Sequence, residues 1–370
     1  MTGIFEVNDN NEAIFNAAVA PILPQVLQGK PSNFFAHGHS GSGKSHTIIG
    51  YDYETTKELG PCLASTRHLM QELARLNAND GSNQLGIGIR MYELRKNSAF
   101  DLLNGRCECF VREGVRPIVT KACWSFQDLS SELHAGIKFR ATGTSTVHDQ
   151  SSRTHAVIGF EIVTKDLLEA RDAIVERQSE LVPVGKYATD VYLEGQIRAF
   201  IQNEKEQYVP NPDYQVDQAC IDTAEARKAE FEAQVTSAEE HESNLFQSIS
   251  RRHGCLGGKL VLVDLAGSEY FDARNGLRPN KTSQEKQERR QINTDLLALK
   301  EVIRARAQNL ARVPFGSSPL IMVLRLHFRA SSDNYGFCDD LTVSPLVREF
   351  AATMNTLKYG SLVGVAGDKK

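Results

Sequence analysis

The chain has 370 residues, of which 41% are hydrophobic and 24% charged, and this balance excludes a mainly disordered protein. No stretch approaches the roughly 18 apolar residues that a membrane-spanning helix needs, and the amino terminus has no basic flank and apolar core of a signal peptide. Seven cysteines, an odd number spread along the chain, favour a reducing compartment over a disulfide framework, with Cys107 and Cys109 as ordinary thiols.

The net charge of −4 is unevenly distributed along the chain. The segment Asp166–His253, called the insert below, holds 18 acidic and 9 basic residues and so carries −9. The remaining residues hold 33 basic and 28 acidic side chains, a charge of +5. A basic body favours an acidic partner, because long-range attraction steers oppositely charged surfaces together, and the acidic insert opposes or redirects that attraction.

In chain order, the spacing of apolar residues predicts alternating helices and strands. The expected helices are Asn10–Gln28, Ser65–Leu76, Phe126–Phe139 and Glu288–Ala307. The expected strands are Ser32–Gly38, Leu85–Leu94, Ala156–Val163 and Lys259–Asp264, while Leu320–Phe328 fits either type. This alternation predicts an α/β fold in which a mostly parallel central sheet is flanked by helices on both faces.

The insert has a different pattern from its surroundings. Its first part has apolar residues every seven positions, such as Leu167, Ile174 and Leu181, which predicts a helix with an apolar stripe. A second, charged helical stretch is expected over Gln218–Arg252, after the loop signal PNPDY. Two interpretations stay open: a helical excursion packed on the body, or an arm that binds a protein partner.

The strongest local signal is the run GHSGSGKS, which fits the pattern G-x-x-x-x-G-K-[ST] between an expected strand and an expected helix. Glycines let successive backbone amides turn toward phosphate oxygens without side-chain clashes. The lysine of the motif places positive charge on the β- and γ-phosphates, and the next hydroxyl is a ligand for Mg²⁺. The residues predicted to bind a nucleoside triphosphate are therefore Gly38, His39, Ser40, Gly41, Ser42, Gly43, Lys44 and Ser45.

Two further motifs resemble elements that sense the nucleotide. The run SSRTH (151–155) precedes one expected strand, and DLAGSE (264–269) begins at the last residue of another. A strand that ends in aspartate well after a phosphate loop is typical of the magnesium side of such sites.

Together these motifs resemble the kinesin motor domain. The family's GQTGSGKTHT appears as GHSGSGKSHT (38–47), its NxxSSRSH as HDQSSRTH (148–155), and its DLAGSE is intact (264–269). Its INxSLxALxxVI appears as INTDLLALKEVI (292–303), and TLKYG (356–360) is similar to the last helix of the motor. The resemblance covers nearly the whole chain except the insert. It implies a P-loop NTPase fold, with one motor domain over residues 1–370 and the helical insert 166–253 within it.

The resemblance also implies a role for each matching residue. Ser45 and Ser152 would lie around Mg²⁺, with Asp264 acting through a bound water. Ser151 would position the attacking water, and the Gly267 amide would sense the γ-phosphate. Arg153 and Glu269 would form the ion pair that closes the two switches, while His46 would pack against the adenine. Loss of contacts to the γ-phosphate would then release a switch segment and move the helix that follows it.

The chain departs from the family pattern at three places besides the insert. The family opens with a strand carrying an Arg-x-Arg-Pro motif, and this sequence begins after that point. His148 replaces the switch asparagine, so altered hydrolysis is expected. The microtubule-contacting run PYRDSKLT becomes PFGSSPLI (314–321), so that Gly316 and Pro319 replace two charges. We expect this to weaken contact with tubulin, with compensation from the nearby Arg304, Arg306 and Arg312.

The resemblance implies an ATPase with ATP and Mg²⁺ as its ligands and movement on microtubules as its function. The expected partner is tubulin, with a protein bound by the insert as a second partner, and with no nucleic acid or membrane. A monomer acting on the cytoplasmic cytoskeleton is expected, because no sustained heptad run follows the motor motifs. The alternative is a non-motile adaptor that binds microtubules or a protein partner without a productive ATPase cycle.

Overall fold

The computed structural model describes residues 4–6, 9–50, 59–79, 83–112, 114–116, 118–140, 153–203, 206–268, 283–308, 310–329, 337–344, 346 and 349–367. The chain divides into two compact units. One, called the body below, comprises Met1–Val163 and Gly254–Lys370, and the other, Thr164–His253, holds the whole of the insert.

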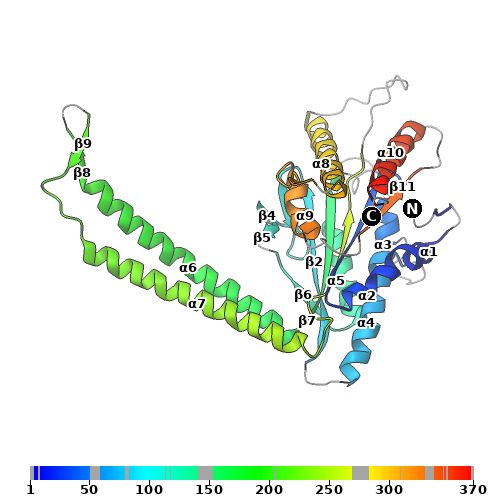
Figure 1. Ribbon diagram of the computed structural model, residues 1–370, viewed down its shortest axis with the longest axis horizontal. Helices are drawn as coiled ribbons and strands as arrows, with labels where there is room; N and C mark the ends of the chain where they lie inside the picture. The colour runs from blue at the N-terminus through cyan, green and yellow to red at the C-terminus, as the bar shows by residue number, and fades with distance from the viewer. Residues whose placement is uncertain are drawn as a thin grey trace. The chain divides into compact units, whose positions relative to one another are not determined.

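A nine-stranded sheet forms the centre of the body within the described residues (Figure 1). Its strands follow the order β11-β1-β10-β7-β2-β3-β4-β5, with β6 paired to β2. Their bounds are β1 Pro31–Gly38, β2 Leu85–Arg95, β3 Ser98–Asp101, β4 Cys107–Arg112, β5 Gly114–Arg116, β6 Lys121–Cys123, β7 His155–Thr164, β10 Lys259–Asp264 and β11 Phe337–Thr342.

The sheet is mixed, which corrects the expectation of a mostly parallel one. Strand β1 is parallel to both β10 and β11, as expected for strands joined through helices. In contrast, β7 is antiparallel to β10, and β2, β3, β4 and β5 form antiparallel ladders in turn. The parallel part is therefore the part that carries the phosphate-loop motif.

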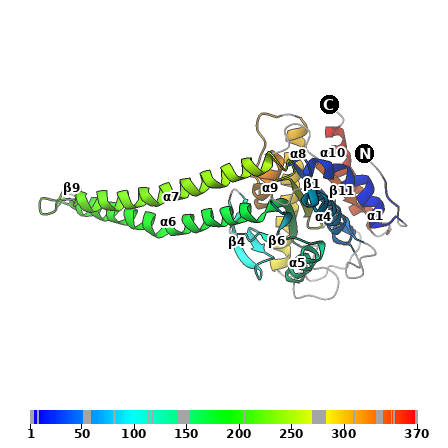
Figure 2. The same ribbon diagram turned by 90° about the horizontal axis from the view of Figure 1, so that it is seen from below.

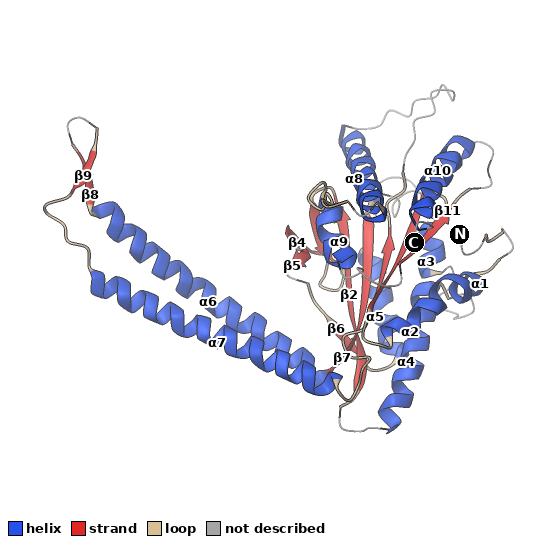
Figure 3. Cartoon of the chain, viewed as in Figure 1, coloured by secondary structure: helices blue, strands red, loops and turns tan. Residues whose placement is uncertain are grey.

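Helices cover both faces of this sheet (Figure 3). The helices α3 (Lys44–Ile49), α4 (Pro61–Asn79) and α5 (Phe126–Phe139) pack on one face. On the other, α8 (Ser283–Ala307) and α9 (Pro319–Arg329) share a buried apolar cluster with β1, β2 and β10, in which Phe35 stacks on Phe328. Helix α10 (Phe350–Gly367) brings Tyr359 onto the ring of His37.

The first expected helix, Asn10–Gln28, is broken into short pieces. The structure has α1 (Asn11–Ile14), a π-helical turn (Phe15–Val19), a 3₁₀ turn (Ala20–Ile22) and α2 (Leu23–Val26). Pro21 and Pro24 lie in this stretch, and a proline has no amide hydrogen to donate to the preceding turn. A single regular α-helix was therefore the wrong prediction here.

The other expected body elements are confirmed. Phe126–Phe139 and Lys259–Asp264 have the predicted bounds, and the remaining predicted strands and helices extend by a few residues. Leu320–Phe328, which fitted either type, lies in α9.

The second unit is a pair of long helices. Helix α6 (Lys165–Arg198) and helix α7 (Gln218–Ser250) run side by side, and a two-stranded hairpin, β8 (Phe200–Gln202) and β9 (Tyr208–Pro210), connects them (Figure 2). Arg171 of α6 donates a 3.0 Å hydrogen bond to Glu242 of α7. The two predicted helical stretches of the insert are thus present, with the second ending at Ser250 rather than Arg252.

The described cysteines contain no disulfide, and their side chains differ in exposure. Cys107 and Cys220 are exposed, whereas Cys62, Cys109, Cys123 and Cys255 are buried. Burial raises the pKa of the Cys62 and Cys255 thiols, so both are protonated at neutral pH. Over the part of the chain that the structure describes, no helix is both long and apolar enough to cross a membrane.

Candidate functional site

The predicted motifs meet at one edge of the central sheet because of the strand directions. Strands β1 and β10 are parallel, so their carboxyl ends, at Gly38 and Asp264, lie at the same edge. Strand β7 is antiparallel to β10, which brings its first residue, His155, to that edge as well. Strand β11 ends there too, with Thr342 opposite Gly38.

The phosphate-loop motif forms an open turn between β1 and α3. Gly41 and Gly43 have φ angles of +77° and +100°, which favour glycine, and no atom lies within 4 Å of where a Cβ would stand. Gly43 is the N-cap of α3, and no side chain caps that helix end. The loop thus turns through two glycine conformations with open space where side chains would stand, as the backbone of an anion-binding turn requires.

Lys44 is buried beneath this turn. Its Nζ donates to the carbonyl oxygens of Gly38, at 3.1 Å, and His39, at 2.7 Å. Burial lowers the pKa of Lys44 to about 8, because the charged form loses hydration, although the nearby Asp264 carboxylate opposes that shift. An anion placed on the loop would favour the charged form of this lysine.

Ser45 and Asp264, both predicted to lie on the magnesium side of the site, are in direct contact. The Ser45 hydroxyl donates to Asp264 Oδ2 at 2.5 Å. The same carboxylate oxygen accepts a 2.5 Å hydrogen bond from Arg140, the residue that follows α5. Arg140 also donates to the carbonyl of Thr154, so it joins the aspartate to the segment before β7. Arg140 and Asp264 are both buried, which makes this a desolvated ion pair.

The backbone after β10 lies against the phosphate loop. The Ser268 amide donates to Gly38, and the Ser40 amide donates to the carbonyl of Ser268. A Cβ on Gly267 would stand 2.5 Å from the backbone N and Cα of Ser40. Only glycine fits at this position. Because the two backbones are this close, a movement of the 264–268 turn toward the loop would displace the backbone at Ser40.

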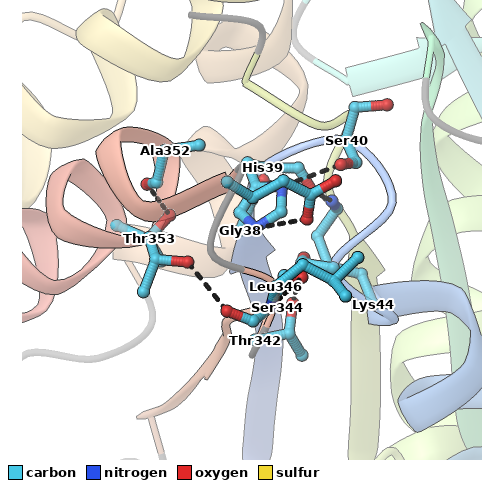
Figure 4. A network of polar contacts seen from close by, with 12 residues as sticks. Gly38, His39, Ser40, Lys44, Thr342, Ser344, Leu346, Ala352 and Thr353 are labelled. Carbon is cyan, nitrogen blue, oxygen red and sulfur yellow. Dashed lines mark hydrogen bonds and ion pairs between the residues drawn. The ribbon is translucent and has the colours of Figure 1, made fainter.

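The loop is held from its other side by the segment between β11 and α10 (Figure 4). Ser42 and Thr342 hydroxyls are hydrogen-bonded at 2.7 Å, and His39 Nε2 lies 3.8 Å from a Glu349 carboxylate oxygen. Thr353 of α10 donates to the Ser344 carbonyl at 3.1 Å, which fixes the start of the helix against that segment. The phosphate loop therefore contacts the end of β11 through Ser42 and the turn after β10 through Ser40.

His155, which the sequence did not assign to the site, contacts the second sensing motif. Its Nδ1 accepts a 3.1 Å hydrogen bond from the Ala266 amide. Its Nε2 lies 3.7 Å from Oδ2 of Asp295 on α8. Both side chains are almost fully buried, so they join the sensing turn to that helix.

The structure brings together only some of the predicted site residues. Gly38–Ser45, Asp264 and Gly267 meet at the sheet edge. His46 is exposed beside them, with its carbonyl accepting from Asn11, and Arg153 is half-buried just before β7. Ser151, Ser152, His148 and Glu269 lie outside the described residues, so their predicted roles and the Arg153–Glu269 ion pair stay predictions.

The family model described as "Kinesin motor domain" matches residues 2–184 and 229–364. The chain belongs to the kinesin motor domain family. The gap in the match, residues 185–228, falls inside the insert, and the matched residues include every motif described above.

Two relatives show how far the similarity to known kinesins extends. The mouse "Kinesin-like protein KIF24" is 25% identical over 361 residues, which are 96% of this chain but 19% of that protein. The chain thus spans about a fifth of that relative's length. A solved structure of KIF14 residues 391–772, a dimer in a two-heads-bound state with AMP-PNP in complex with a microtubule, is 20% identical. It aligns with a TM-score of 0.61 over 96% of this chain and 77% of that one, which supports the same fold.

The residues of this kinesin fold fit a magnesium-bound nucleotide. The positive-φ glycines leave an open cradle, and Lys44 supplies a buried cation beneath it. Ser45 and Asp264 offer hard oxygen ligands of the kind Mg²⁺ prefers. The buried Ser268 hydroxyl and Thr154 hydroxyl have no hydrogen-bond partner among the described residues, which fits a polar ligand nearby.

Sequence reasoning missed Arg140, Thr342 and Glu349. Arg140 is 124 positions from Asp264, and Thr342 is 300 positions from Ser42, so no local motif links the partners. The only signal for Arg140 was its place directly after a predicted helix. These contacts follow from the sheet order, which places distant strand ends side by side.

Proposed function

We propose that this kinesin motor domain binds MgATP on its phosphate loop, hydrolyses it, and couples the reaction to microtubule binding. The observation that carries the proposal is the sheet edge at which the phosphate loop, the Ser45–Asp264 pair and the Gly267 turn are in direct contact. Such an arrangement suits phosphoryl transfer, which depends on positioning and charge stabilisation more than on covalent chemistry by the protein.

Each described residue has a distinct task in this proposal. The loop amides and Lys44 bind the phosphates, while Ser45, with Asp264 acting through water, holds the metal side. Bound MgATP supplies the phosphoryl group and a metal charge that offsets the negative charge developing on it. Arg140 holds the Asp264 carboxylate in place through its hydrogen bond, and the Gly267 turn detects whether the γ-phosphate is present, because it abuts Ser40. Ser151, Ser152 and the Arg153–Glu269 pair would complete the site from the switch side.

Microtubule binding is assigned to α8 and the segment that leads into α9. The structurally similar KIF14 fragment is bound to a microtubule, and the +5 charge of the chain outside the insert suits an acidic filament. Gly316 is exposed and Pro319 is the first residue of α9, so neither offers a charge. Arg304 and Arg312 are exposed nearby, although Arg304 is paired with Glu301 at 3.1 Å. We therefore expect weaker binding than a full set of charges would give, at a cytoplasmic microtubule.

Steady-state ATP hydrolysis, measured with and without microtubules, tests the proposal. Lys44→Ala should abolish turnover, because the phosphates lose their buried cation, whereas Lys30→Ala, which removes an exposed lysine before β1, should not. Microtubules should raise the wild-type rate. Nucleotide binding without any microtubule-stimulated turnover would favour the non-motile adaptor instead, and a Lys44→Ala rate equal to wild type would exclude an ATPase at this site.

The switch ion pair has its own test. Arg153→Ala and Glu269→Ala should each lower hydrolysis, and the double variant should be no worse than either, because the two residues act as a unit. Additive losses would mean that the two side chains do not close the site together.

A further inference from the structure

His155 holds a fixed orientation because of one backbone hydrogen bond. The Ala266 amide can only donate, so Nδ1 accepts and the ring proton is on Nε2. Nε2 then points its hydrogen toward Oδ2 of Asp295, 3.7 Å away, and has no hydrogen-bond partner among the described residues. The imidazole thus lies between the 264–268 turn, called the sensing turn, and α8. It is hydrogen-bonded to the sensing turn and lies just beyond hydrogen-bonding distance of Asp295 on α8.

Asp295 is fixed from its own helix. Its other oxygen, Oδ1, accepts a 3.0 Å hydrogen bond from Gln291, one turn earlier on α8. Oδ2 is left facing His155, and only 4% of the Asp295 side chain is exposed. Burying a carboxylate is costly unless its partners are well placed, so this residue contributes little to stability by itself. The corresponding position of the family motif INxSLxALxxVI is serine, a side chain that is shorter and uncharged.

We propose that Asp295 is a positioning residue that couples α8 to the nucleotide-sensing turn through His155. When α8 and the 264–268 turn approach by a few tenths of an ångström, the 3.7 Å contact becomes a charge-assisted hydrogen bond. When they separate, it is lost. Two positions of α8 then differ in this bond, which gives the nucleotide state a direct influence on the helix. The inference rests on the proposed function and adds a residue that the sequence motifs do not assign.

Hydrogen exchange of α8 is the measurement, since it needs neither hydrolysis nor microtubules. Residues 292–303 would be followed without nucleotide, with the fluorescent analogue mant-ADP and with AMP-PNP. In the wild-type chain we expect exchange to differ between the two nucleotides. The measured quantity is the ratio of the α8 exchange rates in the two nucleotides. In Asp295→Asn and Asp295→Ser this ratio should fall about tenfold, which equals about 1.4 kcal/mol. The dissociation constant of mant-ADP should stay within about twofold, because no ligand of the nucleotide changes.

Matched variants separate coupling from a general structural role. His155→Leu should behave like Asp295→Asn, and their double variant should lose no more, whereas His155→Gln, which can still accept and donate, should recover part of the response. Glu301→Gln removes an exposed carboxylate from the same helix and should respond as wild type does.

Three results would overturn the inference. A wild-type response in Asp295→Asn would show that the carboxylate does not transmit the nucleotide state. Faster exchange of α8 by the same factor in all three nucleotide states would show a structural role only. Failure of the wild-type chain to bind mant-ADP would instead refute the proposed function, and this inference with it.

Discussion

The body and the insert differ in how fully they bury their large apolar side chains. In the body, large residues such as Phe34 and Phe160 are at most 2% exposed, packed between a sheet and two helix layers. In the insert, two long helices pack side by side, and Val182 and Ile197 are 68% and 73% exposed. A substitution of the same chemical kind should therefore have very different consequences in the two units.

Charges show the same contrast. The body buries the Arg140–Asp264 pair and places it beside the phosphate loop. The insert forms its interhelical pair, Arg171–Glu242, at the partly exposed surface of the two helices. Every described residue proposed to bind nucleotide lies in the body. Matched substitutions in the two units should therefore differ in their effects on stability and on nucleotide binding.

The largest expected difference is in the stability lost when Arg140 or Arg171 is replaced by alanine. Arg140→Ala leaves Asp264 buried without its cation and should lower the free energy of unfolding by about 3–5 kcal/mol. Arg171→Ala removes a partly solvated pair and should cost about 1 kcal/mol or less. Urea denaturation followed by circular dichroism measures both. Equal losses would mean that the insert pair is as desolvated as the body pair.

The second prediction concerns the stability of the body at low pH. Burial, with the charges of Lys44 and Lys300, lowers the pKa of His37 to about 3, so this ring stays neutral in the folded body. The unfolded chain takes up a proton near pH 6.5, so stability is full above that pH and falls by about 1.4 kcal/mol per unit below it, toward pH 3. His37→Phe keeps an aromatic ring on Tyr359 and should flatten this slope by one proton between pH 6.5 and 4.5.

The control for the acid prediction is a chain in which a short Gly-Ser linker replaces residues 166–253. In this shortened chain His37→Phe should change the pH slope by the same amount as in the complete chain, because His37 and the charges that shift its pKa are in the body. Parallel stability curves for wild type and His37→Phe would contradict the prediction.

Two glycines give a third test. Gly267→Ala forces a methyl group against the Ser40 backbone and should destabilise the body by about 1–3 kcal/mol while weakening nucleotide binding. Gly185 is in α6 with no atom within 4 Å of its Cβ position, so Gly185→Ala should stabilise the helix by about 0.5–1 kcal/mol. Thermal unfolding of both variants checks the opposite signs. Unchanged mant-ADP affinity in Gly267→Ala would mean that the turn and the loop move independently.

The smallest expected effect is on the filament. Replacing residues 166–253 by the same linker removes a charge of −9 and should strengthen microtubule binding at low salt by up to about fivefold, with the gain lost at high salt. Cosedimentation at two ionic strengths measures this. Equal or weaker binding by the shortened chain would show that the insert does not oppose the filament.

Local patterns predicted the elements well because each depends on neighbouring residues. The apolar run Lys259–Asp264 and the amphipathic run Phe126–Phe139 have the same bounds in the structure. The spacing of glycines and lysine in GHSGSGKS likewise predicted a glycine turn that carries a lysine, and in the structure that lysine is buried. The broken helix at residues 11–26 was missed because Pro21 and Pro24 outweighed the apolar spacing around them.

Local patterns could predict neither the direction of the strands nor the side-chain contacts between segments far apart in the sequence. An alternating run like Ala156–Val163 is equally compatible with parallel and antiparallel pairing, so the mixed sheet could not be deduced from it. The contacts of Arg140 and Asp295 join segments more than 100 residues apart. Sequence reasoning located the phosphate loop but not the side chains that connect it to the rest of the body.

The distribution of thiols offers a spectroscopic use of the two-unit architecture. Maleimide reagents attack the thiolate, so buried thiols with a raised pKa, such as Cys62 and Cys255, react slowly near neutral pH. Of the cysteine side chains that the structure describes, Cys107 in the body and Cys220 in the insert are the exposed ones. A donor and an acceptor fluorophore can thus be attached to natural residues, one in each unit. Energy transfer between them would measure the distance between the two labelled units in solution, with and without added nucleotide.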